Sequence, residues 1–155
     1  MKPLVTSVKE VLLDAMKAEM EGRAFLIALS ERAGTAPVKQ KLLNLADREF
    51  VHRAHLERRL REETGESAPP INELPAVAVA PEVSNLTMTR ALKIVLERER
   101  EAESNYRFLA ERVQDPEMIQ LFLELAELEW KHKAEIQAEY DASINDDPES
   151  FLDNM

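Results

Sequence analysis

The 155-residue sequence contains no cysteine and only three glycines. Without thiolates there can be no disulfide, iron–sulfur cluster or cysteine-based zinc site, and nothing indicates an oxidising compartment. No apolar run approaches the ~20 residues that span a bilayer, and the first residues lack the apolar segment of a signal peptide. We therefore expect a cytoplasmic protein without a membrane partner.

Basic residues are fewer than acidic ones, with 20 Lys and Arg against 30 Asp and Glu, which gives a net charge of −10. An acidic chain without a basic stripe is a poor partner for nucleic acid or an anionic membrane. Most of the surplus Glu residues are expected to be solvated on helix surfaces. The informative ones are those that fall where an apolar residue belongs.

The residues that are abundant favour helix. Ala, Glu, Leu, Arg and Lys dominate, so the fold class is predicted to be all-α. Apolar periodicity predicts four helices, and they cover residues 7–33, 36–63, 87–113 and 116–141. The proline-containing segment 64–86 connects the second helix to the third. Residues 1–141 are expected to form one domain, followed by an acidic tail, 142–155, that is disordered or docks on a partner through Phe151 and Leu152.

The two halves of the chain are copies offset by 80 positions. Glu19 matches Glu99, Glu49 matches Glu129 and His52 matches His132. The helix-capping residues also match, with Ser7 in the first half and Thr87 in the second. Within each half the connection between the helices is short, so each half is predicted to be an antiparallel helical hairpin.

The segment 64–86 is long enough to run the length of such a hairpin. A helix of ~27 residues is ~40 Å long, whereas ~23 extended residues reach ~75 Å. Two hairpins joined by one long crossover form a four-helix bundle of the ferritin-like type. The alternative is a flexible tether between separate hairpins, which is disfavoured because one hairpin alone has no partner for its apolar face.

The apolar face of each predicted helix is interrupted at its middle by an acid. Spacings of three and four residues place Glu19 between Ala15 and Gly22, and Glu99 between Val95 and Ala102. On the second and fourth helices a Glu is followed three residues later by a His on the same face. Burying one unpaired carboxylate costs several kcal/mol, so four at one level require a cation between them.

A Glu from two helices and Glu-x-x-His from the other two is the pattern of carboxylate-bridged two-metal bundles. The six predicted ligands are Glu19, Glu49, His52, Glu99, Glu129 and His132. Oxygen ligands with imidazole suit iron or manganese, with zinc as a substitute. The alternative is a metal-free polar layer, in which two imidazolium groups would leave part of the negative charge uncompensated.

Four segments resemble the rubrerythrin branch of the ferritin-like superfamily. They read EMEGRAFL at 19–26, LADREFVH at 45–52, EREAESNY at 99–106 and LAELEWKH at 125–132. The resemblance extends over residues ~7–140 on the same periodicity. It implies two iron ions per chain, bridged by Glu49 and Glu129, with Glu19 and Glu99 as terminal ligands and one His on each metal.

The sequence departs from the family's pattern in two respects. Rubrerythrins usually have a further Glu three residues after the third-helix ligand, where this chain has Ala102; this brings the site nearer to ferroxidase centres. Glu103, one residue further on, is expected to pair with a base such as Arg23. The rubredoxin domain is missing, so electrons are expected from an external donor. Tyr106, two turns after Glu99, is a candidate to assist the metal site or a satisfied core Tyr.

The expected function is therefore that of a rubrerythrin-type di-iron oxidoreductase, which reduces hydrogen peroxide or O2 with electrons from an external donor. Two alternatives stay open: a ferroxidase or iron-storage protein, and a non-catalytic bundle in which metal has only a structural role. Helix faces outside the metal stripe favour a homodimer, and Trp130, which points away from the metals, is the first candidate for its interface.

Overall fold

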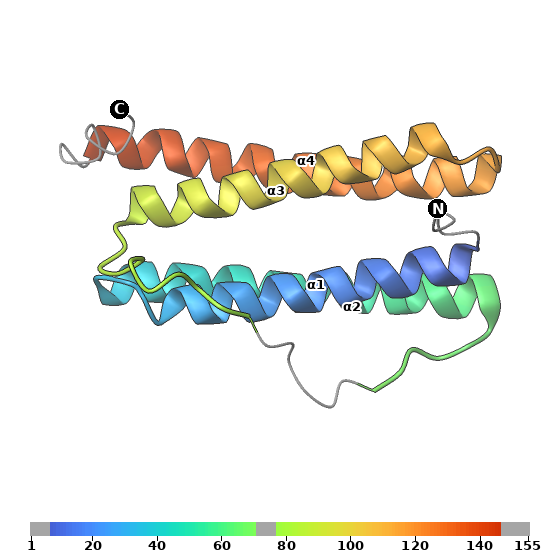
Figure 1. Cartoon of the computed structure of the whole chain (residues 1–155), viewed down its shortest axis with the longest axis horizontal. Helices are drawn as coiled ribbons and strands as arrows, with labels where there is room; N and C mark the ends of the chain where they lie inside the picture. The colour runs from blue at the N-terminus through green and yellow to red at the C-terminus, as the bar shows by residue number, and fades with distance from the viewer. Residues whose placement is uncertain (1–6, 71–76, 147–155) are drawn as a thin grey trace. The chain divides into compact units, whose positions relative to one another are not determined.

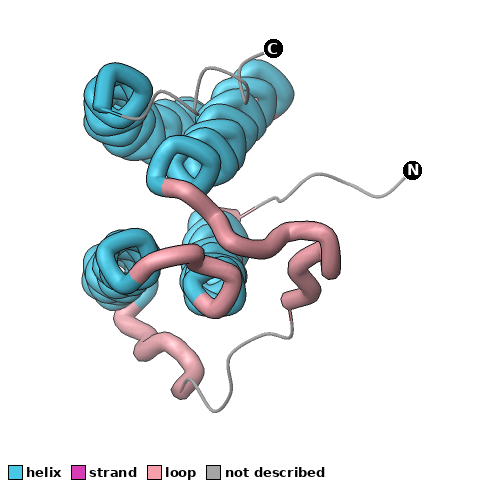
Figure 2. The backbone as a smooth tube through the Cα atoms, turned by 90° about the vertical axis from the view of Figure 1, so that its left-hand side faces the viewer, coloured by secondary structure: helices cyan, strands magenta, loops and turns pink. Residues whose placement is uncertain are grey.

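The computed structural model describes residues 7–70 and 77–146 and consists of four helices. They are α1 (Val8–Ser30), α2 (Ala36–Thr64), α3 (Met88–Arg112) and α4 (Pro116–Asp146), as labelled in Figure 1. Figure 2 shows only helices and loops in this part of the chain. Four helices and no strand are the content of a ferritin-like four-helix bundle, and the all-α prediction is confirmed. Phe151 and Leu152 of the predicted tail lie outside the described residues.

The chain divides into two compact units, Met1–Leu86 and Thr87–Met155. Each unit contains one helical hairpin, α1–α2 in the first and α3–α4 in the second. The predicted division of the sequence into two matched hairpins is thus found in the structure. None of the described helices is long and apolar enough to cross a membrane.

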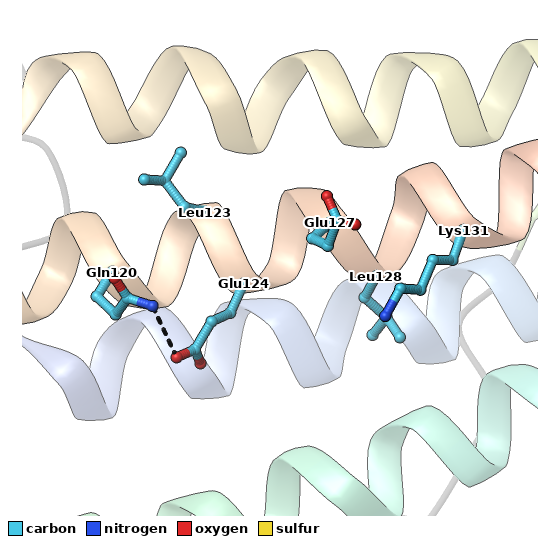
Figure 3. Close-up of a pocket in the computed structure, with 6 residues that line it drawn as sticks. All are labelled: Gln120, Leu123, Glu124, Glu127, Leu128 and Lys131. Carbon is cyan, nitrogen blue, oxygen red and sulfur yellow. Dashed lines mark hydrogen bonds between the residues drawn. The ribbon is translucent and has the colours of Figure 1, made fainter.

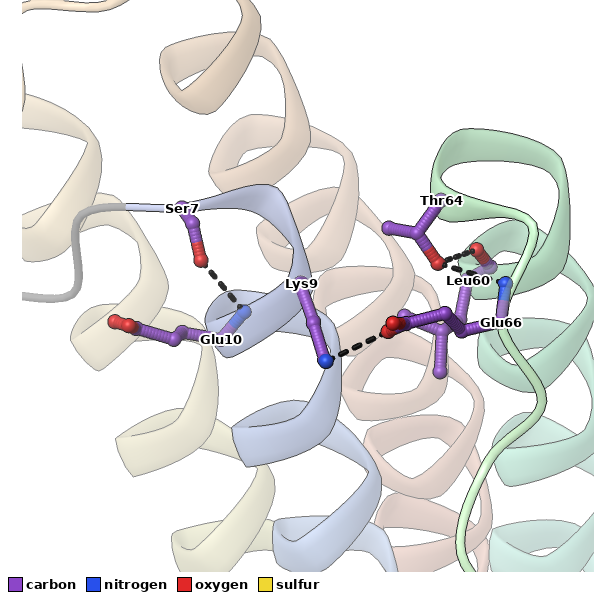
Figure 4. Close-up of polar contacts among 6 residues, drawn as sticks. All are labelled: Ser7, Lys9, Glu10, Leu60, Thr64 and Glu66. Carbon is purple, nitrogen blue, oxygen red and sulfur yellow. Dashed lines mark hydrogen bonds and ion pairs between the residues drawn. The ribbon is translucent and has the colours of Figure 1, made fainter.

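The helices begin where the capping residues predict. The side chains of Ser7 and Thr87 each accept a hydrogen bond from the backbone amide three residues further on, at 3.1 and 3.2 Å (Figure 4 shows the first). Asp115 does the same for α4 by accepting from the amide of Glu117 at 2.9 Å. These bonds satisfy amides that the first helical turn leaves without a partner.

Two helix ends differ from the predicted positions. α1 ends at Ser30, about one turn before the predicted end. α4 continues to Asp146, past the predicted residue 141. The extension accompanies a tertiary contact, in which Thr89 in the first turn of α3 donates a hydrogen bond to the hydroxyl of Ser143, at 2.9 Å. Such contacts are not visible in local sequence preferences.

The described residues of the crossover contact the first hairpin at both of its ends. Just after α2 ends, Glu66 forms an ion pair with Lys9 at the start of α1, with Nζ and Oε2 at 2.6 Å (Figure 4). At the opposite end of α1, the amide of Gly34 donates to the carbonyl of Leu86, and the amide of Leu86 donates to the carbonyl of Arg32. The described ends of segment 64–86 therefore lie at opposite ends of the first hairpin, as the predicted crossover requires.

Two residues hold the end of the crossover against α1. The Arg32 guanidinium donates to three backbone carbonyls between residues 79 and 83. A Cβ atom at Gly34 would lie only 3.1 Å from the backbone of Asn85, so glycine avoids a tight contact at that close approach. The connection therefore belongs structurally to the first hairpin.

Each hairpin buries an apolar stripe that continues on either side of its acids. Leu42 on α2 and Phe122 on α4 occupy matched positions in the repeat and are 0% and 2% exposed. The other buried stripe residues of α1 and α4, ligands left aside, are Leu12, Ala15, Gly22, Leu26, Leu29, Met118, Leu125 and Ile136. This packing fixes the direction of the Glu and His side chains that lie between them.

Candidate metal centre

In the first hairpin, Glu19 of α1 lies beside Glu49 and His52 of α2. One ligand atom from each of the three side chains lies within 4.8 Å of the others. Glu49 and His52 are three residues apart, so the helix presents both side chains to α1. Glu19 and His52 are buried and Glu49 is partly exposed.

The second hairpin repeats the arrangement with Glu99 of α3 and with Glu129 and His132 of α4. Here too the ligand atoms lie within 4.8 Å of one another. All three side chains are buried, and Glu129 is only 7% exposed. The structure thus brings the six predicted ligands together as two groups of three, one in each hairpin.

Both groups have the chemistry of a divalent-metal site. The His52 Nδ1 atom lies 3.5 Å from Glu19 Oε2, and the His132 Nδ1 atom lies 4.0 Å from Glu129 Oε2. These distances are too long for strong hydrogen bonds. Each group combines two carboxylates with one imidazole, and of the four carboxylates only Glu49 is partly exposed. Such a group favours a bound cation over an empty polar pocket, because buried charges need compensation. Oxygen and imidazole donors match iron, manganese or zinc.

Tyr106, the predicted assisting residue, lies on α3 and is half-buried. It is seven residues after Glu99, which places both side chains on the same face of the helix, two turns apart. Its role at a metal site stays a prediction.

Sequence reasoning missed an ion-pair cluster beside the second group. Glu103 is 9% exposed. Its Oε1 atom lies 2.6 Å from Lys133 Nζ, and its Oε2 atom lies 2.8 Å from Arg107 Nε. The hydrogen bond from Lys133 is the main cause that lowers the pKa of Glu103, and Arg107 acts in the same direction.

The bases that contact Glu103 are thus Lys133 and Arg107 rather than the predicted Arg23. Arg23 donates instead to the carbonyl of Ala46 and to Asp47. The sequence did contain one signal for the correct partner. Arg107 follows Glu103 by four residues, the spacing at which opposite charges pair along a helix.

A shallow pocket on α4 is separate from both ligand groups (Figure 3). Its lining residues are Gln120, Leu123, Glu124, Glu127, Leu128 and Lys131. One hydrogen bond, from Gln120 to Glu124 at 3.2 Å, crosses it. None of the lining residues is a predicted ligand.

Comparison with known proteins identifies one family and one solved structure. The sequence profile of the Rubrerythrin family matches residues 10–140. A solved structure described as "Hypothetical Protein Pfu-1136390-001 From Pyrococcus furiosus" is similar at 27% sequence identity, with a TM-score of 0.53. The similarity covers 90% of this chain and 91% of that one. No curated protein matches.

Proposed function

The chain belongs to the rubrerythrin family, and from this premise we propose that it is a di-iron oxidoreductase that reduces hydrogen peroxide or O2 with electrons from an external donor. The observation that carries the proposal is the pair of matched Glu–Glu–His groups. We propose that these six side chains hold two iron ions as one carboxylate-bridged centre within a bundle formed by residues 1–141. Glu49 and Glu129 would bridge the ions, and Glu19 and Glu99 would be terminal ligands.

Charge balance supports two divalent ions. Each group contributes two carboxylates, so the four negative charges of both groups are neutralised by two Fe²⁺ ions, while neutral imidazoles complete the ligand set. Manganese or zinc would satisfy the same balance as substitutes. A single ion would leave two buried negative charges, which is costly in a low-dielectric environment.

Bound iron would supply the electrons that reduce the oxidant. The residues of the chain have three tasks around it. The Glu and His side chains hold their positions because the neighbouring Leu, Ala and Val residues pack them into fixed rotamers. The same apolar neighbours, such as Leu45 and Leu125, limit access of water to the ligands. The hydroxyl of Tyr106 is the proposed donor of a hydrogen bond or a proton at the reacting side of the site.

A ferroxidase is the second candidate, and Ala102 favours it. In this position rubrerythrins usually carry the further Glu described above, which this chain lacks. A ferroxidase would oxidise iron and release it, whereas a peroxidase would keep its two ions and be reduced again by a donor. The two functions therefore differ in what happens after the first oxidation.

The test is a two-stage experiment on metal-stripped protein loaded with two equivalents of Fe(II) under argon. Addition of one equivalent of hydrogen peroxide should rapidly oxidise both Fe(II) ions to Fe(III). Absorption spectroscopy measures this oxidation. Addition of a chemical reductant and a second equivalent of peroxide should then repeat the cycle with iron still bound. Absence of any peroxide-dependent spectral change would contradict the proposal and leave a structural metal. Release of Fe(III) after one cycle would favour the ferroxidase.

A matched pair of variants controls for non-specific iron. E129A removes a proposed bridging ligand and should abolish the cycle. E127A removes an exposed Glu two residues away on the same helix and should leave the cycle intact. Loss of activity in both variants would indicate an effect on the fold rather than on the metal.

We propose a homodimer as the working assembly. Phe50 and Trp130 occupy matched positions of the repeat and are 49% and 45% exposed, which is unusual for large apolar side chains. Size-exclusion chromatography tests this directly. A dimer agrees with the proposal, and a large shell would favour iron storage.

A further inference from the structure

The partly buried ion pair between Glu103 and Lys133 lies next to two of the proposed metal ligands. Glu103 follows Glu99 by one helical turn on α3, and Lys133 is the residue directly after His132 on α4. The two charged atoms are 2.6 Å apart, the distance of a strong charge-assisted hydrogen bond. The pair therefore links α3 to α4 at the level of the ligands and restrains how far one helix can shift along the other.

The matched positions of the first hairpin cannot form this link, because both are arginines. Arg53 pairs with Glu57 on its own helix, and it donates to the carbonyl of Pro69 in the crossover at 3.1 Å. Neither contact joins α2 to α1.

At the matched level of the first hairpin, Arg23 forms a weaker polar link between α1 and α2. Arg23 reaches the carbonyl of Ala46 at 3.2 Å and the carboxylate of Asp47 at 3.3 Å. The Asp47 side chain is 77% exposed, so solvent screens this contact. This contact thus restrains α1 against α2 less than the pair of Glu103 and Lys133 restrains α3 against α4.

Burial differs in the same direction. All three ligands of the second group are buried, whereas Glu49 in the first group is partly exposed. A ligand already held in place loses less conformational entropy when it binds a metal, and burial strengthens its attraction for a cation. Both effects favour the second group as the tighter site.

We infer that the two groups fill in order, with the first divalent cation bound by Glu99, Glu129 and His132, and that Glu103 and Lys133 are the positioning residues that set this order. The inference rests on the proposed function only in that both groups must bind a metal. Glu103 and Lys133 do not belong to the ligand set; they act through the spacing between α3 and α4. Loss of such outer partners typically costs roughly 10-fold to 100-fold in metal affinity.

Stepwise titration with Co(II) measures the order, because the visible absorption of Co(II) reports its coordination. Metal-free protein should bind two ions in steps that differ roughly 10-fold in affinity. H132A should remove the tighter step and H52A the weaker one. Removal of the tighter step by H52A would overturn the assignment.

A charge-balanced double variant tests the role of the ion pair. E103Q/K133M removes both charges of the pair together, so the net charge near the ligands is unchanged. It should lower the Co(II) affinity of the first step roughly 10-fold, so that the two steps have similar affinities. The matched control in the first hairpin is R53M/E57Q, which also removes an ion pair without a change of net charge and should leave the first step unaltered. K133R should keep the wild-type order.

A purely structural role for the pair predicts a different result. E103Q/K133M would then lower the unfolding temperature of the metal-free protein and leave the ratio of the two affinities as it is in the wild type. That outcome, or equal loss in both double variants, would overturn the inference. Failure of the wild-type protein to bind a second Co(II) ion would instead contradict the proposed function itself, so the two failures are distinguishable.

Discussion

The two hairpins share their ligands but not the charges around them. Glu, Glu and His recur at an offset of 80 residues, with all ligand atoms of each group within 4.8 Å. The neighbouring positions differ, since Arg23 and Arg53 of the first hairpin correspond to Glu103 and Lys133 of the second. The Glu and His pattern that predicts a metal site is thus the same in both hairpins, whereas the contacts that hold the helices beside the ligands differ.

The hairpins also differ in what their outer residues hold. In the first, Arg32 and Arg53 both donate to carbonyls of the crossover. In the second, Lys133, which matches Arg53, joins α3 to α4 through Glu103, and Thr89 joins the same helices through Ser143. Arg53 therefore contacts a loop, whereas the matched Lys133 contacts the neighbouring helix.

The largest expected effect comes from the matched core residues Leu42 and Phe122. L42A should destabilise the metal-free protein by about 2–5 kcal/mol and F122A by about 3–5 kcal/mol, because each leaves a cavity in a fully buried layer. Denaturant unfolding monitored by circular dichroism measures both. If the protein unfolds in one transition, and either variant moves its midpoint to a lower denaturant concentration, the two hairpins unfold together.

L123A is the control for this pair, since Leu123 is 41% exposed and should cost no more than about 0.5 kcal/mol. An F122A variant as stable as L123A would contradict the assignment of the core.

A smaller effect is expected from E103Q, which should change how the free energy of unfolding depends on pH. Glu103 belongs to the second hairpin, and the matched residue of the first hairpin is Arg23. The hydrogen bond from Lys133 holds the pKa of Glu103 below its ordinary value of 4.5. Its contribution to stability is therefore fully present above pH 4.5 and is lost as the pH falls through the lowered pKa. Between pH 6 and the acid range, the wild type should lose about 1.5–3 kcal/mol more than E103Q.

Urea unfolding of the metal-free proteins over this range gives the difference directly, because all other titrating groups are common to both. The exposed residue Glu101 supplies the control variant, E101Q. Parallel curves for the wild type and E103Q would show that the ion pair contributes nothing to stability.

The smallest effects concern the helix caps, where the hairpins are alike. S7A and T87A should each cost about 1 kcal/mol, because each removes the acceptor for one amide of the first turn. T35A should cost less than about 0.5 kcal/mol, since the Thr35 side chain makes no capping hydrogen bond. Thermal unfolding of the three variants measures the comparison. Equal losses in all three would show that the cap contacts do not account for the helix starts.

Much of this architecture can be predicted from residues that are close together in the sequence. The four helices follow from the apolar periodicity, and their starts follow from residues such as Ser7, Thr87 and Pro116. The two ligand groups follow from acids placed on apolar faces, because spacing along a helix determines which side chains meet. These features depend on neighbours within one or two turns.

What the sequence could not predict depends on contacts between distant residues. The extension of α4 to Asp146 accompanies the bond between Thr89 and Ser143. To predict that Lys133 pairs with Glu103, one must know the register of α3 against α4. The sequence contains several bases that could have been the partner. A charge pattern alone names the kind of partner a buried acid needs but not the residue that supplies it.

The most direct test of the central claim is an anaerobic Fe(II) titration of the metal-stripped protein, with bound iron counted per chain. The wild type should saturate at two irons, and H52A and H132A should each retain one ion, which is bound more tightly in H52A than in H132A. Retention of two irons by both E49A and E129A would contradict the bridged centre. Binding of fewer than two irons by the wild type would contradict the di-iron assignment altogether.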